Sequence, residues 1–232
     1  YLVRTNAGPE VIKEVTEFME KMYSQYCRIF RYRKRLKSRF KVYVFKNAEE
    51  FRKYAKGVGA PPQARGYYDP NSKEIVTWWE YEHEEMNTRV VLFHEGTHQF
   101  IDLVTWREPP LWFNEGCAVY FENSRLEGGK LITGIVPKKR LQLLKSAIKS
   151  KTYTPFEVLF RKKGYLNIVE YSQSWSVVYF LIHAYGGRNR WIFDRFWNLM
   201  VKGKIKEHSF ADLIRKPGES REAAMKKFES YW

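Results

Sequence analysis

The sequence predicts an α+β fold, in which an N-terminal mixed β-sheet with helices is followed by a mainly α-helical C-terminal lobe. Short strand-like segments alternate with helical ones before residue 80, and an apolar segment of helical spacing covers about residues 85–104. Helical spacing dominates the rest of the chain. With 232 residues, 44% of them hydrophobic and 17% aromatic, the chain can bury a sizeable core. These observations predict two lobes, 1–105 and 106–232.

The first segments have clear boundaries. Residues 1–5 and 40–45 are predicted as strands, while apolar residues recur at helical spacing from Pro9 to about Phe30. Asn47 is expected to cap a short helix, because an Asn side chain accepts a hydrogen bond from the first helical turn.

Two further strands are predicted at 65–68 and 74–79. Asp69-Pro70-Asn71-Ser72 joins them, and these residue types favour a tight turn. After the second strand, Glu84 and Glu85 would complement the positive N-terminal end of the next helix.

The second lobe is predicted as a succession of helices. Gly186-Gly187 is expected to end one of them, because glycine readily adopts the left-handed conformation that closes a helix. The predicted helices are 110–123, 137–150, 154–162, 167–185, 189–202, 207–215 and 219–230.

The central helix carries three polar residues that need partners. Apolar residues cover nearly every face of 85–104, which is typical of a buried helix, and buried polar groups are costly unless paired or bound to metal. His94 and His98 lie four residues apart, hence on one face and about 6 Å apart along the axis. This pattern predicts one metal ion bound by both imidazoles, with Glu95 taking a proton from water. A pair of histidines on a helix surface is the alternative.

A second motif, Trp112-Phe113-Asn114-Glu115-Gly116-Cys117-Ala118, supplies a third candidate ligand. Glu115 follows His98 by 17 residues, and Pro109-Pro110 lets a second helix turn back onto the first. The small residues after Glu115 would allow close approach of the backbones. Two His, one Glu and an open fourth position are typical of a catalytic zinc site, whereas a surface salt bridge is the alternative for Glu115 alone.

Together these motifs resemble those of the gluzincin metallopeptidases, in which HExxH is followed by (W)xxEGxA on the next helix. The nearer resemblance is to peptidase-MA-like bacterial domains of unassigned specificity, and it covers about residues 1–187. Those domains carry three motif helices in the order found here, at His94–Gln99, Pro110–Glu122 and Tyr171–Leu181. The resemblance implies a zincin-like fold whose two lobes form one catalytic unit.

The resemblance also implies a role for each matched residue. Zn²⁺ would be held by His94, His98 and Glu115. Glu95 would be the general base. Tyr171 corresponds to a tyrosine that donates a hydrogen bond to the oxyanion in related peptidases, a task that suits a phenol because it donates while neutral. Aromatic packing along its helix is the alternative for Tyr171, and His183, 12 residues further on, is a rival donor.

The chain departs from the family pattern in two places. It lacks the Gly-x-Met-Glu-Asn segment with which aminopeptidases of this clan capture a substrate N-terminus. Val119 stands four residues after Glu115, where thermolysin-type enzymes carry the Asp that orients a histidine ligand. We expect Asp102 or Asn114 to orient a histidine ligand in place of that Asp.

The strand at 74–79 corresponds to the place where gluzincins hold an extended substrate by strand addition. Trp78 and Trp79 would then line a substrate cleft. The alternative for both tryptophans is the apolar core.

The formal net charge is +15 and is unevenly distributed. Eight basic residues and no acidic residue lie from Arg28 to Lys41. Such a face attracts nucleic acid, anionic cell-surface polymer or acidic lipid, and an ordinary solvated surface is the alternative.

Other features limit the cellular context. No apolar run approaches the roughly 18 residues of a membrane span. The absence of an initiator Met and of a signal peptide suggests a mature or excised domain. Cys27 and Cys117 are expected to be free thiols, which fits a reducing compartment and an exported bacterial protein equally. Localisation and oligomeric state stay open.

The function that the sequence favours is that of a zinc-dependent metallopeptidase acting on a peptide or protein substrate. Two alternatives remain. One is a zincin-fold module without peptidase activity that binds an anionic polymer through the Arg28–Lys41 face. The other is a zinc hydrolase of a non-peptide amide.

Overall fold

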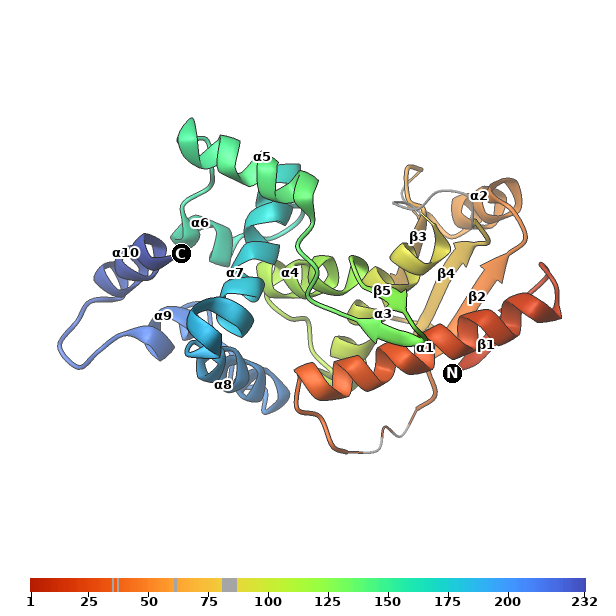
Figure 1. The fold of residues 1–232 in the computed structure, drawn as a ribbon, viewed down its shortest axis with the longest axis horizontal. Helices are drawn as coiled ribbons and strands as arrows, with labels where there is room; N and C mark the ends of the chain where they lie inside the picture. Colours follow the sequence, from red (N-terminus) through yellow and green to blue (C-terminus); the bar gives the residue numbers. More distant parts are fainter. Residues whose placement is uncertain (35, 37, 61, 81–86) are drawn as a thin grey trace. The chain divides into compact units, whose positions relative to one another are not determined.

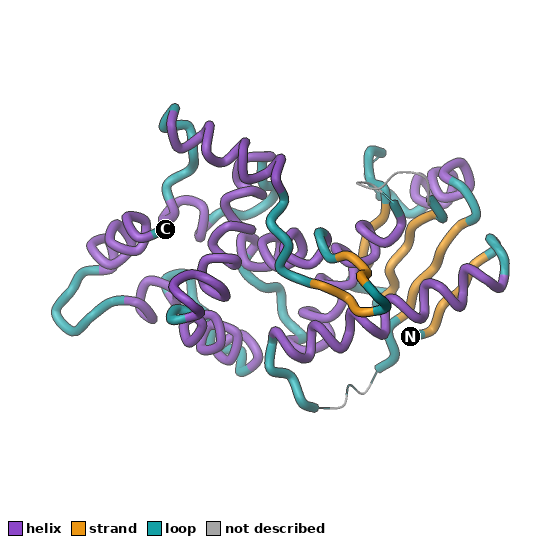
Figure 2. The backbone as a smooth tube through the Cα atoms, viewed as in Figure 1, coloured by secondary structure: helices purple, strands orange, loops and turns teal. Residues whose placement is uncertain are grey.

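The chain divides into two compact units in the computed structural model, which describes residues 1–34, 36, 38–60, 62–80 and 87–232 (Figure 1). The first unit consists of Tyr1–Val104 and Phe121–Ile135, and the second of Thr105–Tyr120 and Val136–Trp232. The predicted α+β class is confirmed: the strands lie in the first unit, and the described part of the second is helical (Figure 2).

A four-stranded mixed sheet forms the centre of the first unit. Its order is β1 (Leu2–Thr5), β2 (Lys41–Phe45), β4 (Glu74–Trp78) and β3 (Gly66–Asp69). β1, β2 and β4 run parallel to one another, whereas β3 pairs antiparallel with β4. β3 therefore forms one edge of the sheet, and β4 lies inside it.

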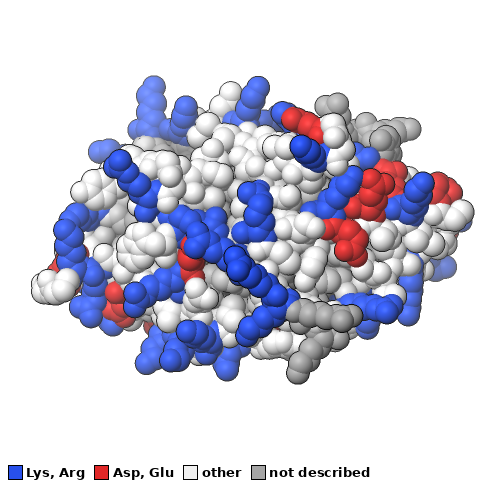
Figure 3. Space-filling model, turned by 60° about the horizontal axis from the view of Figure 1, so that its bottom comes forward, with Lys and Arg blue, Asp and Glu red and all other residues white. Residues whose placement is uncertain are grey.

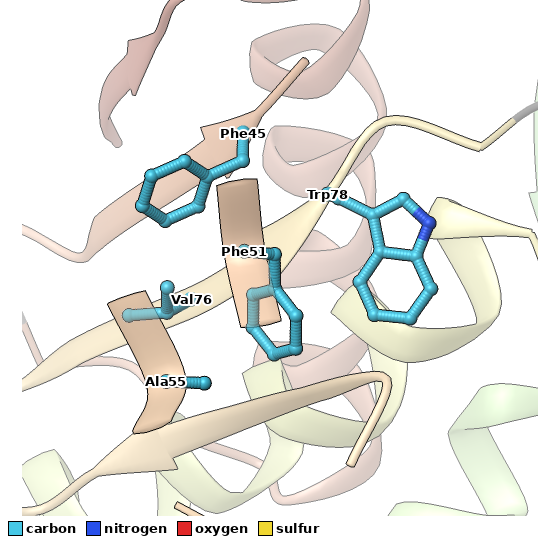
Figure 4. Close-up of a cluster of buried hydrophobic side chains, with 5 residues drawn as sticks. All are labelled: Phe45, Phe51, Ala55, Val76 and Trp78. Carbon is cyan, nitrogen blue, oxygen red and sulfur yellow. The ribbon is translucent and has the colours of Figure 1, made fainter. Parts of the chain in front are cut away.

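Helix α2 (Ala48–Gly57) covers one face of this sheet. Phe51 and Ala55 of α2 pack against alternate residues of β2 and β4, among them Phe45 and Trp78, in a buried cluster (Figure 4). Asn47 accepts a hydrogen bond from the Glu50 amide, so the predicted cap of this helix is confirmed.

Helices α1 (Pro9–Ile29) and α3 (Thr88–Thr105) cover the opposite face. The ring of Tyr23 in α1 contacts Phe40, just before β2, and Phe100 of α3. A Cβ on Gly66 of β3 would meet Val91 of α3 at 2.4 Å, so only glycine allows this close approach. The side of the sheet that carries α3 is thereby fixed.

The predicted turn between β3 and β4 is confirmed. Asp69 ends β3, and its carboxylate accepts hydrogen bonds from the amides of Asn71 and Ser72. The predicted role of Glu84 and Glu85 at the start of α3 falls outside the described residues.

One hairpin was absent from the prediction. β5 (Arg125–Glu127) and β6 (Lys130–Ile132) pair antiparallel through a turn at Gly128-Gly129, where both glycines have positive φ. Strands of three residues are too short to show a period of two, so only the glycine pair signalled this hairpin.

Aromatic side chains form the core of the second unit. Rings of Trp112, Phe160 and Phe210 contact one another, and further aromatic residues extend this core. The helices are α4 (Leu111–Glu122), α5 (Lys138–Lys149), α6 (Phe156–Arg161), α7 (Ile168–Gly187), α8 (Arg190–Val201), α9 (Ser209–Ile214) and α10 (Arg221–Tyr231). Each lies close to its predicted range. The last two residues of α4 belong to the first unit.

Three smaller expectations are also settled. Both cysteines are free thiols, as predicted. The helical conformation of α7 ends before Gly186-Gly187, because Ala184 already has extended backbone angles and Tyr185 lies in the left-handed region. Among the described residues, none of the helices has both the length and the apolar character needed to cross a membrane.

Candidate metal centre

Helix α3 carries the His94–His98 motif. Its start is defined by side chains: Asn87 accepts from the Val90 amide, and Thr88 accepts from the Glu80 amide. The rings of His94 and His98 lie 4.9 Å apart between centroids, as expected for residues one helical turn apart. Both side chains are partly buried, so each contacts protein atoms and is also partly exposed to solvent.

The other motif residues anchor α3 to its surroundings. The Tyr26 hydroxyl of α1 donates to the Phe93 carbonyl, and a Cβ on Gly96 would come within 2.8 Å of that hydroxyl. Thr97 also donates to the Phe93 carbonyl. On the sheet side, the buried Gln99 amide donates to the carbonyls of Lys41 and Lys73 at 3.0 Å each. These contacts explain why small and amide residues stand between and beside the histidines.

Glu122, the last residue of α4, pairs with the first histidine. Its Oε2 lies 2.7 Å from Nδ1 of His94, and both side chains are largely buried. A carboxylate only accepts, so Nδ1 carries the hydrogen and Nε2 keeps the lone pair that a metal ion requires. Sequence reasoning missed this residue. The available signal was its position two helical turns after Glu115, which places both carboxylates on one face of α4.

Asp102 does not take the role that the sequence suggested for it. Its carboxylate accepts from the Tyr68 hydroxyl and, at 2.6 Å, from Lys73 Nζ. Burial and the neighbouring Asp102 raise the pKa of Tyr68 well above its usual range, so the hydroxyl stays protonated and donates. Asp102 therefore fixes β3 against α3 instead of orienting a histidine. The same role for Asn114 is not supported either, because its buried Oδ1 has no hydrogen-bond partner among the described residues.

Glu95 is held by the backbone of β3. The Tyr68 amide donates to Glu95 Oε2 at 3.0 Å. An amide donor stabilises the charged form of a carboxylate and fixes its direction. The edge strand thus orients the residue that follows the first histidine.

Glu115 completes a group of three candidate ligands with His94 and His98. Each residue offers one ligand atom, and these atoms all lie within 4.8 Å of one another. Two imidazole nitrogens and a carboxylate oxygen at such separations can bind one metal ion. The predicted triad is therefore present, while the identity of the metal stays a prediction.

Next to Glu115, α4 packs closely on α7 within the second unit. A Cβ on Gly116 would lie 2.4 Å from the Ser174 carbonyl oxygen, so a glycine is required there. Tyr171 lies one turn before Ser174 on α7, partly buried, with the Arg140 guanidinium 6.0 Å from its ring. Its role as an oxyanion donor stays a prediction.

The rival donor His183 lies at the far end of α7. Its exposed imidazole is 3.0 Å from the Tyr120 hydroxyl and stacks on that ring. An 18 Å separation along the helix axis is expected for residues 12 positions apart, at about 1.5 Å per residue. Tyr171 therefore remains the preferred candidate.

The expectation that β4 receives an extended substrate is wrong. β2 and β3 occupy both sides of β4, so its backbone groups are already paired. Trp78 is 5% exposed and packs on Phe51 in the core, which is the alternative position given above. Trp79 follows the strand and donates its amide to the Phe45 carbonyl. The sheet edge next to Glu95 is β3.

Basic residues from Arg28 to Lys41 are exposed where the structure describes them, with Arg35 and Lys37 outside the described residues. Arg28 is held by Gln25 and Thr133. On the face drawn in Figure 3, Lys and Arg are spread over the surface and exceed Asp and Glu, in line with the +15 charge.

Comparison with known families gives one match. Residues 89–187 match a family described as "Protein of unknown function (DUF1570)". The matched range contains the three candidate ligands, Glu95 and Tyr171. No curated protein matches the sequence. These comparisons assign no activity to the chain.

Proposed function

We propose that the chain is a zinc-dependent metallopeptidase of the gluzincin type. The observation that carries the proposal is the meeting of His94, His98 and Glu115, with Glu95 held beside them by the Tyr68 amide. The mixed sheet, whose antiparallel edge strand β3 lies against α3, supports the zincin-like arrangement that the resemblance implies.

The donor set fits Zn²⁺. Two imidazoles and one carboxylate are typical ligands of catalytic zinc, and a second carboxylate on an imidazole is the usual support. Glu122 supplies that support for His94. Bound Zn²⁺ supplies Lewis-acid chemistry, which lowers the pKa of water to about 7 and polarises a carbonyl group.

Glu95 is the proposed general base. Its carboxylate accepts the proton of the attacking water and then passes this proton to the leaving amine, so the residue returns to its starting state. The Tyr68 amide keeps Oε2 in a fixed direction, which reduces the reorganisation that the transfer requires. Tyr171 is the proposed donor to the oxyanion, because a neutral phenol can donate without a change of charge.

Edge strand β3 is the proposed binding element for a peptide or protein substrate. Its partner β4 uses one side of β3, and an extended peptide can pair by β-strand addition with the backbone groups of the other side, except for the Tyr68 amide, which donates to Glu95. This places substrate binding on Gly66–Asp69 instead of on the strand that the sequence suggested.

Metal content and activity together test the proposal. Purified protein is expected to contain one equivalent of zinc by plasma emission spectrometry and to cleave members of a peptide library. Glu95→Gln is expected to retain zinc and to lose activity by at least 10²-fold, the usual share of a general base. His94→Ala is expected to lose both. Glu49→Gln, on the exposed surface of α2, is the matched control. Absence of stoichiometric metal, or equal cleavage by Glu95→Gln, contradicts the mechanism.

Binding of an anionic polymer is the second candidate function, and the net charge of +15 favours it. It predicts an affinity for heparin or nucleic acid that falls steeply with salt, without hydrolysis of any peptide. A library of acyl amides tested in parallel separates peptide hydrolysis from the remaining alternative, hydrolysis of a non-peptide amide.

A further inference from the structure

The second unit contains an apolar cavity at the end of α7 that is separate from the candidate ligands. Its volume is about 480 Å³, within the usual range of small-molecule sites. Aromatic and aliphatic side chains from α7, α8, α9 and α10 form its wall: Phe180, Ile192, Ile214, Ala224 and Phe228. A chain of methylene groups or an aromatic ring could be buried among them.

Three cationic side chains surround this cavity. Arg188, Lys216 and Lys227 are exposed, and within the described residues their side chains have neither a hydrogen bond nor an ion-pair partner. Glu219, the carboxylate among the described lining residues, accepts from the Lys216 amide at 2.9 Å. The mouth of the cavity thus has an excess of positive charge.

Two tyrosines at the mouth expose apolar surface. Tyr185 and Tyr231 are 59% and 57% exposed, and the Tyr185 hydroxyl donates to the Tyr231 carbonyl. Tyr185 has a φ of 53°, in the left-handed region that non-glycine residues seldom adopt. The turn after the helical part of α7 therefore directs an aromatic ring to the mouth at a cost in backbone energy.

We propose that this cavity binds an amphipathic anion, an aliphatic carboxylate whose chain lies among Phe180, Ile192 and Phe228. The carboxylate would lie toward the unpaired cations at the mouth. A neutral ligand would gain no electrostatic attraction from those cations, and a cationic ligand would be repelled. This site is independent of the proposed peptidase function.

Titration calorimetry of the whole chain tests the proposal. Sodium decanoate, below its micellar concentration, is expected to bind saturably with one equivalent per chain. Octanoate is expected to bind roughly tenfold more weakly, because each buried methylene contributes about 0.8 kcal/mol. Decyltrimethylammonium, with the same chain and the opposite charge, is expected not to bind. Decanoate affinity is expected to fall as salt is added.

Charge variants locate the binding at this mouth. Arg188→Gln and Lys227→Gln are each expected to weaken decanoate binding by about two- to fivefold, the range of exposed ion pairs. Lys226→Gln is the matched control, because Lys226 is the exposed neighbour of Lys227 and does not line the cavity. All three positions are on the surface, so the substitutions are expected to leave folding unchanged, which circular dichroism can check.

Four results overturn the proposal. The first is the absence of saturable decanoate binding, and the second is equal binding of the cationic amphiphile. The third is an equal effect of Lys226→Gln and Lys227→Gln. The fourth is a dimer, detected by sedimentation, that decanoate does not dissociate and that prevents decanoate binding. Such a dimer would assign the cavity to a second copy of the chain.

Discussion

Nδ1 of His94 and Oε2 of Glu122 lie 2.7 Å apart and form a hydrogen bond between the motif helix and the last residue of α4. The pairing fixes which imidazole nitrogen carries the hydrogen and holds the plane of the ring. Glu122 thus performs the task for which the sequence offered Asp102 or Asn114.

Removal of this carboxylate is predicted to weaken zinc binding. Glu122→Ala is expected to lower zinc affinity by about 10- to 100-fold, the usual effect of losing a carboxylate that orients a histidine ligand. Glu122→Gln is expected to lie between that variant and the parent, because its carbonyl oxygen still accepts from Nδ1. Competition with a chromogenic chelator measures both. Glu127→Gln, on the exposed strand β5, is the control, and equal affinities of all variants would refute the assignment.

The bond between Tyr68 and Asp102 is predicted to stabilise the edge strand. Tyr68→Phe removes a hydroxyl that donates to a partly buried carboxylate, at an expected cost of about 1–3 kcal/mol in the free energy of unfolding. Urea denaturation measures this cost. Tyr67→Phe is the control, because the Tyr67 hydroxyl has no hydrogen bond within the described residues. If both variants lose the same stability, the hydroxyl of Tyr68 has no special role.

The contact between Gly116 and Ser174 is predicted to exclude any larger residue. Gly116→Ala would place a Cβ 2.4 Å from a backbone oxygen, so α4 and α7 must move apart, at an expected cost of about 1–3 kcal/mol. Gly57→Ala is the control: no heavy atom lies within 4 Å of its added Cβ, and an increase of up to about 1 kcal/mol is expected. Melting temperatures of the two variants should therefore shift in opposite directions.

The free energy of unfolding is predicted to fall at acidic pH because the Glu170 carboxylate becomes protonated. Burial raises the pKa of this carboxyl, but hydrogen bonds from Lys162, the Asn167 amide and Thr154 outweigh it, and the pKa is lowered. A lowered pKa in the folded state means that the stabilisation is present above the unfolded value, about 4.3, and is lost as the pH falls below it.

Urea midpoints between pH 7 and pH 3 measure this contribution. Glu170→Gln is expected to be less stable than the parent at pH 7, and the difference should shrink toward pH 3. Glu157→Gln, in an exposed pair with Arg161, should follow the parent at each pH. A constant difference between Glu170→Gln and the parent across this range would contradict the pKa direction.

The sequence was sufficient for those features that depend on local periodicity and on fixed spacing. His94 and His98 must share a helix face, and Asn47 must meet an amide three residues later, because helix geometry dictates both. The approach of Glu115 to the histidines followed from its place on the next helix.

Features that depend on long-range pairing were not accessible in this way. Nothing in the local pattern of residues 74–79 distinguishes an inner strand from an edge strand, so β4 was given a role that its position between β2 and β3 excludes. Likewise, Glu122 is one of several acids near the motif, and only the path of α4 brings it to His94. Sequence order alone fixes neither relationship.

The side chain of Gln99 has a consequence for the motion of the motif helix. Because its amide donates to the carbonyls of Lys41 in β2 and of Lys73 just before β4, α3 cannot unwind at this point without losing both hydrogen bonds to the sheet. Backbone amides of α3 around Gln99 should therefore exchange with deuterium at the same slow rate as the backbone amides of β2 and β4. Protection at that level would mean that the histidines keep their spacing for as long as the first unit is folded.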